Sequence, residues 1–169
     1  MGKRYLLAIR PNEEGHTYPV VFVSQTSASR LSVWASVRDG TVDLSQLSLP
    51  RVQNITYHYT CHLRGIGVKD EGVRLLKQIG NVDFRPMEKT DQCCGFGGTF
   101  AVKYPAISGA IVEDKVNCIA DTKASTLICN DAGCTMNISG MCHRKSLGVR
   151  TKHIAELMAE AMGIDVTGW

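Results

Sequence analysis

Residues 126–134 read Thr-Leu-Ile-Cys-Asn-Asp-Ala-Gly-Cys, and this stretch decides the fold. Its first four residues, Thr126–Cys129, form an apolar run of the length of a buried strand. Cys134 opens a helical pattern that continues to Arg144. A strand that leads through a short turn into a helix is the repeating unit of an α/β sheet. In such sheets, reactive side chains gather where the strands end.

The same alternation recurs on both sides of this stretch. We expect further strands at 55–59, 82–84 and 149–151, and helices at 72–79, 105–122 and 153–162. This order favours an α/β fold, in which a parallel sheet is flanked by helices in Rossmann-like layers. Strand-to-helix turns of that fold are expected to hold four cysteines: Cys61, Cys93, Cys94 and Cys134. The fold therefore brings distant sulfurs to one edge of the sheet.

The first 50 residues have a different character. They contain β-prone stretches at 5–9, 20–24 and 31–37, separated by Gly, Pro and Ser, but no reactive constellation. We therefore expect a β-prone N-terminal segment of unknown role at 1–50. A cysteine-rich, metal-binding domain is expected at 51–169, and the total length of 169 residues suits about one domain.

Composition and charge exclude several classes of partner. The net charge is +3 without a long basic run, so neither nucleic acid nor an anionic membrane is indicated. No window of about 18 apolar residues could span a membrane, and the apolar run at 6–9 is too short for a signal peptide. The expected location is the cytoplasm.

Seven cysteines, all beyond residue 60, then carry the chemistry. A reducing compartment disfavours disulfides and makes metal or redox roles more frequent. Iron–sulfur clusters usually take four thiolates, and helix N-termini lower thiol pKa values. Three glycines after Cys94 can adopt positive φ and turn backbone N–H groups toward sulfur or an anion: Gly95, Gly97 and Gly98.

The other candidates have structural alternatives. Cys118 and Cys142 share helical faces with apolar residues and are expected in the core. Cys129 ends a strand, where it either packs or joins the site. His62, beside Cys61, is a further candidate ligand of a Cys/His zinc site.

Three remaining polar groups stay open between chemistry and structure. His58 would either hydrogen-bond a ligand sulfur or a substrate carboxylate, or be satisfied by its neighbours. Arg64 is either an anion-attracting group or a solvated surface residue, and His153 is expected to begin its helix.

Common catalytic motifs are missing from the sequence. The run Gly95-x-Gly97-Gly98 is not a dinucleotide fingerprint, because Phe100 stands where the third glycine belongs. There is also no phosphate-cradling Gly-Lys-Ser/Thr motif, serine nucleophile elbow or His-Glu-x-x-His zinc motif. NAD, kinase and ordinary hydrolase functions are not indicated.

Three segments together resemble the cysteine-rich, or Cys-Cys-Gly, domain found in the B-type polypeptide of heterodisulfide reductase: Tyr57–Arg64, Cys93–Phe100 and Asp131–Cys134. That pattern has a Cys, a gap of thirty-odd residues, Cys-Cys, a similar gap and Cys-x-x-Cys. In this chain Asp131 stands where the first Cys of the closing pair belongs. The resemblance therefore implies four thiolate ligands, Cys61, Cys93, Cys94 and Cys134, with Asp131 as a further candidate.

Within that superfamily, residues 54–160 are most similar to the lactate-utilisation protein A family. The resemblance implies an iron–sulfur oxidoreductase subunit that holds a [4Fe–4S] cluster and works with B- and C-type lactate-utilisation subunits on L-lactate, a small 2-hydroxy acid. Members usually carry two cysteine motifs and this chain carries the second. We therefore expect half of a split system, a truncated reading frame or a single-motif relative.

Two other functions use the same residues. The thiolates could hold zinc in an assembly module without redox activity. Alternatively, the same electron-transfer role could serve glycolate, glycerol-3-phosphate or heterodisulfide chemistry.

Overall fold

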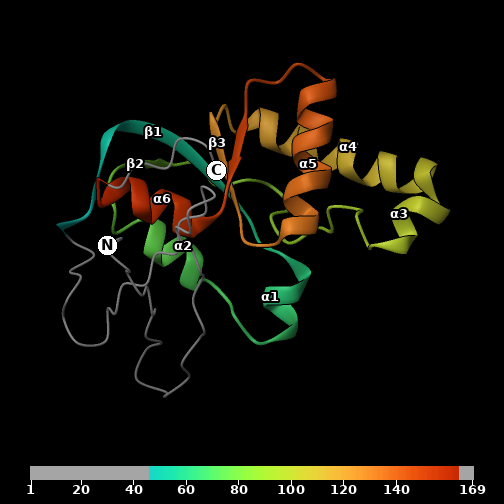
Figure 1. Ribbon diagram of the computed structural model, residues 1–169, viewed down its shortest axis with the longest axis horizontal. Coiled ribbons are helices and arrows are strands. Elements are labelled where there is room, and N and C mark those ends of the chain that lie inside the picture. Colours follow the sequence, from blue (N-terminus) through green and yellow to red (C-terminus); the bar gives the residue numbers. More distant parts are fainter. Residues whose placement is uncertain (1–45, 164–169) are drawn as a thin grey trace, which may run out of the picture. The chain divides into compact units, whose positions relative to one another are not determined.

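The computed structural model of the chain describes residues 46–163 (Figure 1). The β-prone stretches expected at 5–9, 20–24 and 31–37 lie outside the described residues. The strands are β1 (Ser48–His58), β2 (Gly80–Phe84), β3 (Thr126–Cys129) and β4 (Arg150–Lys152). The helices are α1 (Cys61–Gly65), α2 (Glu71–Leu76), α3 (Thr99–Lys103), α4 (Pro105–Asp121), α5 (Ala132–Arg144) and α6 (Ile154–Ala161).

The four strands form one sheet in the order β2-β1-β3-β4. β1 is parallel to β3, with Ile55 beside Thr126 and His58 beside Cys129, and β3 is parallel to β4. The expected α/β fold, a parallel sheet flanked by helices, is confirmed. Because β1 and β3 end at paired residues, the segments that follow them begin at the same edge of the sheet.

β1 is longer than the strand expected at 55–59, because its first half carries mainly exposed residues that give no apolar signal. Two helices of five residues, α1 and α3, were not expected as separate elements. α4 begins at Pro105, as predicted, where a missing N–H is harmless. α2 is shorter than its pattern, since it ends at Leu76 and β2 begins at Gly80.

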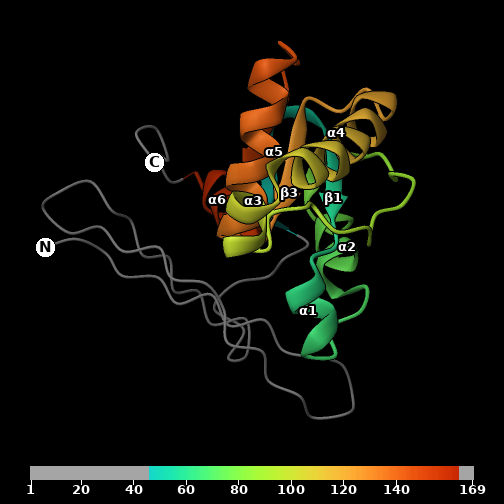
Figure 2. The same cartoon turned by 90° about the vertical axis from the view of Figure 1, so that its right-hand side faces the viewer.

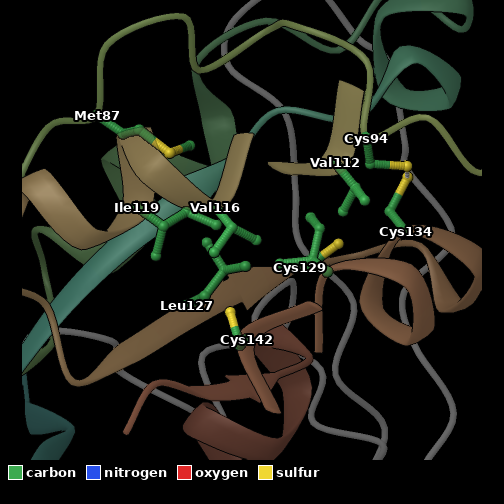
Figure 3. Packing of buried hydrophobic residues seen from close by; sticks show 10 residues of the cluster. Met87, Cys94, Val112, Val116, Ile119, Leu127, Cys129, Cys134 and Cys142 are labelled. Carbon is green, nitrogen blue, oxygen red and sulfur yellow. Dashed lines mark hydrogen bonds between the residues drawn. The ribbon is translucent and has the colours of Figure 1, made fainter. Parts of the chain in front are cut away.

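The core beside the site lies between β3 and two helices. α4 packs beside α5 (Figures 1 and 2). Alternate residues of a strand point to one face, and Leu127 and Cys129 both point toward these helices. Figure 3 shows them packed with apolar side chains of α4, among them Val112, Val116 and Ile119. Each aliphatic side chain buried here stabilises the fold by about 1.5–3 kcal/mol.

The chain divides into two compact units. The larger comprises Val52–Leu76 and Val82–Ile154. The described part of the smaller comprises residues 46–51, 77–81 and 155–163, in which Gly80 N–H donates to the Leu47 carbonyl at 2.8 Å. All residues of the candidate site belong to the larger unit. Within residues 46–163, none of the helices has the length and apolar character required to cross a membrane.

Candidate metal centre

His58 is the last residue of β1, and its side chain is 1% exposed. It is paired in register with Cys129 of β3. Paired residues of parallel strands project to the same face of a sheet. His58 therefore points to the face that α4 and α5 cover, at the edge where β1 and β3 end.

The hydrogen bond of His58 fixes its tautomer. Its Nδ1 lies 3.3 Å from the backbone carbonyl oxygen of Thr90. A carbonyl oxygen only accepts, so Nδ1 carries the proton and Nε2 carries a lone pair. Among the described residues this Nε2 is buried and has no hydrogen-bond partner.

Cys134 stands in the first turn of α5. The N-cap is Asp131, whose Oδ1 accepts the N–H of Cys134 at 2.9 Å. Asp131 has the extended backbone of an N-cap, and its short side chain reaches the first-turn donors. The thiol of Cys134 is thereby placed at the positive end of the helix, beside the end of β3.

Cys94 comes from the loop between β2 and α3 and is 2% exposed. The Asn137 side-chain amide on α5 donates to the Cys94 carbonyl at 2.8 Å. On the other side, the Ser108 hydroxyl on α4 donates to the Gly95 carbonyl at 2.8 Å. Both helices thus hold the loop against the core.

Three donor atoms converge at this point. His58, Cys94 and Cys134 each offer one ligand atom, and these atoms all lie within 4.8 Å of one another. The sulfurs of Cys94 and Cys134 are 2.9 Å apart and face each other, whereas that of Cys142 points away toward Leu127 (Figure 3). We call His58, Cys94 and Cys134 the donor triad.

The surroundings of the sulfurs lower the pKa of two cysteines and raise that of a third. The pKa of Cys94 is lowered to about 4, first by its hydrogen bond with Cys134 and against the effect of burial. The pKa of Cys129 is lowered to about 6, again first by Cys134. The pKa of Cys134 is raised by the same two hydrogen bonds and by burial. The proton shared by the sulfurs of Cys94 and Cys134 therefore resides on Cys134.

The other two cysteines of the expected ligand set lie outside the triad. Cys61 is the first residue of α1 and is exposed, and Thr60 caps that helix. Cys93 is also exposed, and its sulfur accepts the N–H of Gly95 at 3.3 Å. Of the four expected thiolates, Cys94 and Cys134 are thus brought together. Cys61 begins α1, and Cys93 precedes Cys94 in the loop between β2 and α3.

The glycines of the loop adopt the backbone that was expected. Gly95, Gly97 and Gly98 have positive φ values of 81°, 51° and 57°. Gly95 also approaches α4 closely, because a Cβ atom there would lie 2.7 Å from the Ser108 carbonyl oxygen. The sharp path of the loop beside Cys94 therefore requires glycine at this position.

The further candidate ligands are engaged with each other. His62 Nδ1 lies 2.5 Å from Asp131 Oδ2, while the other carboxylate oxygen caps α5. The His62 side chain is otherwise exposed. Cys129 is fully buried behind the triad, and its sulfur lies 3.5 Å from the Asp131 carbonyl oxygen.

The remaining sequence candidates have structural surroundings. Cys142 is buried in the core, as expected, and Cys118 is half-buried against it. Arg64 pairs with Asp91 at 3.4 Å on the surface. His153 immediately precedes α6, and burial lowers its pKa to about 4.

Sequence reasoning did not select two residues that the structure brings into play. His58 was considered as a neighbour of a ligand and not as a ligand, although its place at the end of a parallel strand was a usable signal. Lys115 interrupts the apolar stripe of α4 and is completely buried. A lysine at such a position is rare enough to attract notice.

The donors of the triad fit a soft metal centre. Thiolate sulfur and neutral imidazole are the ligands of zinc and of iron–sulfur clusters. A buried imidazole nitrogen without a partner is costly unless something binds it. The unpartnered Nε2 therefore agrees with a site that receives a metal or a cluster.

Comparison with known proteins agrees with this chemistry. Residues 55–139 match the model of a family described as "Cysteine-rich domain". The chain is 40% identical over 112 residues to Lactate utilization protein A 2 of Bacillus cereus strain Q1, covering 66% of this chain and 46% of that protein. It is 44% identical over 104 residues to Lactate utilization protein A of Bacillus licheniformis, covering 61% and 44%. The chain thus spans less than half the length of these curated relatives.

Proposed function

The chain belongs to the cysteine-rich domain family, and from that premise we propose that it is an iron–sulfur oxidoreductase subunit that relays electrons during oxidation of a small 2-hydroxy acid. The relatives named for lactate utilisation support L-lactate as that acid. The observation that carries the proposal is the buried donor triad with its unpartnered His58 Nε2. The cytoplasm remains the expected location.

The residues that would hold a [4Fe–4S] cluster are the four cysteines at the edge of the sheet: Cys61, Cys93, Cys94 and Cys134. Cys94 and Cys134 are already adjacent and buried. When bound, such a cluster exchanges single electrons. The chain itself supplies thiolate charge through Cys94 and keeps water away from two of the sulfurs.

Oxidation of a 2-hydroxy acid to a 2-oxo acid releases two electrons and two protons, so this chain requires a partner. It contains no dinucleotide motif that would accept a hydride. We propose that B- and C-type lactate-utilisation subunits complete the complex. In this arrangement the chain passes the electrons on one at a time.

Metal analysis of anaerobically purified chain tests the proposal. We expect about four iron and four sulfide per chain and a spectrum that bleaches on reduction. The variants Cys94→Ala and Cys134→Ala should each lose most of the iron. The matched control Cys142→Ala removes a buried sulfur of the same helix as Cys134 and should retain the cluster.

Substrate is tested with the partner subunits present. L-lactate should reduce the cluster when the B- and C-type subunits are added and not when the chain is alone. If glycolate or glycerol-3-phosphate reduced the cluster and L-lactate did not, the chain would have the same electron-transfer role in another complex. Absence of iron and sulfide after anaerobic reconstitution would refute the redox function.

A zinc-stabilised assembly module is the second candidate, because two sulfurs and one imidazole nitrogen are a frequent zinc donor set. In that case the purified chain would hold one zinc per chain without sulfide. Removal of the zinc by a chelator would then lower the thermal stability of the chain. No redox signal would be present before or after this treatment.

A further inference from the structure

Three donor groups lie within hydrogen-bond distance of the backbone carbonyl oxygen of Thr90. It accepts the N–H of Tyr59 at 3.1 Å and Nδ1–H of His58 at 3.3 Å, and the Lys115 ammonium lies 3.5 Å away. The Thr90 hydroxyl donates to the Tyr57 carbonyl at 2.8 Å. Thr90 is therefore held to the end of β1 by its own backbone and side chain.

Lys115 holds the same turn from the opposite side. It lies on α4 with none of its surface exposed, and its ammonium donates to the carbonyl of Lys89 as well as approaching that of Thr90. Within the described residues, no carboxylate lies within 4.0 Å of this ammonium. Burial of a cation is costly, and at short range the two carbonyls compensate for it.

This arrangement determines what His58 can offer. With its Nδ1 proton donated to a fixed carbonyl, the ring cannot rotate or change tautomer without breaking that bond. Metal-bound histidines usually donate their second ring N–H to a carbonyl or carboxylate in this way. The free Nε2 lone pair then lies within 4.8 Å of both sulfurs of the triad.

We propose that His58 binds the metal centre through Nε2, and that the Thr90 carbonyl and the buried Lys115 ammonium are the positioning groups that hold its ring for that purpose. The inference rests on the proposed function, since it presupposes a metal or cluster at Cys94 and Cys134. It puts a nitrogen ligand in the place of one of the two exposed cysteines, Cys61 or Cys93, because a four-iron cubane takes four protein ligands, and it gives Lys115 a role.

Cobalt(II) is a suitable probe because it takes the same ligands as zinc and its visible bands report ligand type and number. The full chain, freed of metal under anaerobic conditions, is titrated with cobalt(II) alone. His58→Asn keeps a side-chain N–H that can donate to Thr90 and removes Nε2. This variant should lower the affinity for cobalt(II) more than about 100-fold. Loss of a residue that only hydrogen-bonds a ligand typically lowers metal affinity roughly 10–100-fold.

The positioning role has its own variants. Lys115→Met keeps the length and apolar stem but removes the ammonium, and should weaken cobalt(II) by about 10–100-fold with unchanged bands. Val116→Ala, at the next buried position of α4, is the control for loss of packing and should leave the affinity unchanged. If Lys115→Met does not fold, Thr90→Val is the substitute variant. It removes only the hydrogen bond of the Thr90 hydroxyl to the Tyr57 carbonyl, and should lower the affinity for cobalt(II) about tenfold.

NMR of the imidazole nitrogens gives a readout that packing alone would not move. In metal-free wild-type protein, His58, identified by its absence in His58→Asn, should show the tautomer protonated at Nδ1. In Lys115→Met the two tautomers should both be populated, whereas Val116→Ala should match the wild type.

The outcomes separate the inference from the function on which it rests. If His58→Asn binds cobalt(II) as tightly as wild type while Cys94→Ala does not, His58 is not a ligand and the thiolate centre stands. If Cys94→Ala and Cys134→Ala also bind normally, the proposed centre itself is refuted. A His58 protonated at Nε2, or a Lys115→Met affinity no weaker than that of Val116→Ala, would overturn the positioning role.

Discussion

The carboxylate of Asp131 joins the imidazole of His62 to the start of α5, with Oδ2 2.5 Å from His62 Nδ1 and Oδ1 2.9 Å from the N–H of Cys134. Asp131 stands where the family pattern places a cysteine. It ties the turn that carries Cys61 to the helix that carries Cys134, without using a thiolate. We therefore interpret this departure as a structural link between the segments that carry Cys61 and Cys134.

Two substitutions separate the functions of Asp131. Asp131→Ala removes the N-cap and the contact with His62, and should lower the free energy of unfolding of metal-free protein by about 1–2 kcal/mol. Asp131→Asn retains a good N-cap and loses only the charge, so we expect a loss below about 1 kcal/mol, as for exposed ion pairs. Urea unfolding measures both. If Asp131→Ala and Asp131→Asn lowered the free energy of unfolding equally, the N-cap hydrogen bond would contribute nothing to stability.

Gly95 should tolerate no side chain. Its φ is +81° and a Cβ atom would meet the Ser108 carbonyl oxygen at 2.7 Å. The left-handed backbone alone costs an L-residue about 1–2 kcal/mol, and the clash with backbone adds to this. Gly95→Ala should therefore lower the free energy of unfolding by more than about 2 kcal/mol, and should also weaken metal binding by displacing Cys94.

Gly109 is the matched control for this substitution. It lies inside α4, and a Cβ atom there would meet nothing within 4 Å. Gly109→Ala should raise the stability by up to about 1 kcal/mol, because alanine is the better helix former. If Gly109→Ala lowered the free energy of unfolding as much as Gly95→Ala, the result would contradict the close approach of the loop to α4.

Cys94 should be ionised in metal-free protein at neutral pH. Its pKa is lowered to about 4, whereas burial raises the pKa of Cys142, which stays a thiol. The ultraviolet absorbance of thiolate should therefore be present at neutral pH. It should be reduced in Cys94→Ala and unchanged in Cys142→Ala.

The same shift has a consequence for stability. The pKa of Cys94 is lower in the folded chain than the ordinary value of 9.0. Its contribution is therefore complete above pH 9 and is lost as the pH falls through about 4. Cys94→Ala should flatten this part of the stability profile. A wild-type profile in the variant would show that the Cys94 thiolate is not stabilised by folding.

The sheet could be predicted from the sequence because buried parallel strands are short apolar runs, as at Thr126–Cys129. The convergence of Cys94 and Cys134 could also be expected, since both follow strand ends. That His58 faces these two sulfurs could not be expected. It depends on the side to which the last residue of β1 points, which its pairing with Cys129 sets.

Lys115 shows a second limit of the sequence pattern. Its ammonium is compensated by the carbonyls of Lys89 and Thr90, more than twenty residues away in the chain. Every residue has a backbone carbonyl, so the residue type does not indicate which carbonyl accepts a hydrogen bond. No sequence motif therefore predicts this contact. A single charged residue within an apolar helical stripe is the remaining signal.

His153 should make the stability depend on pH in a window of its own. Burial lowers its pKa from 6.5 to about 4, so the folded chain keeps it neutral where the unfolded chain protonates it. Its contribution to stability is complete above pH 6.5 and declines as the pH falls toward 4, by up to about 1.4 kcal/mol per pH unit. Urea unfolding between pH 6.5 and 5 measures this slope above the range in which most carboxyl groups titrate.

His153→Gln removes the titrating ring and should reduce the slope in this window, while His143→Gln, at an exposed position of α5, should retain the wild-type slope. The two variants exchange the same residue types, so composition and net charge are matched. If His153→Gln loses stability equally at every pH, the ring contributes packing alone. Its neutral state would then have no energetic link to folding.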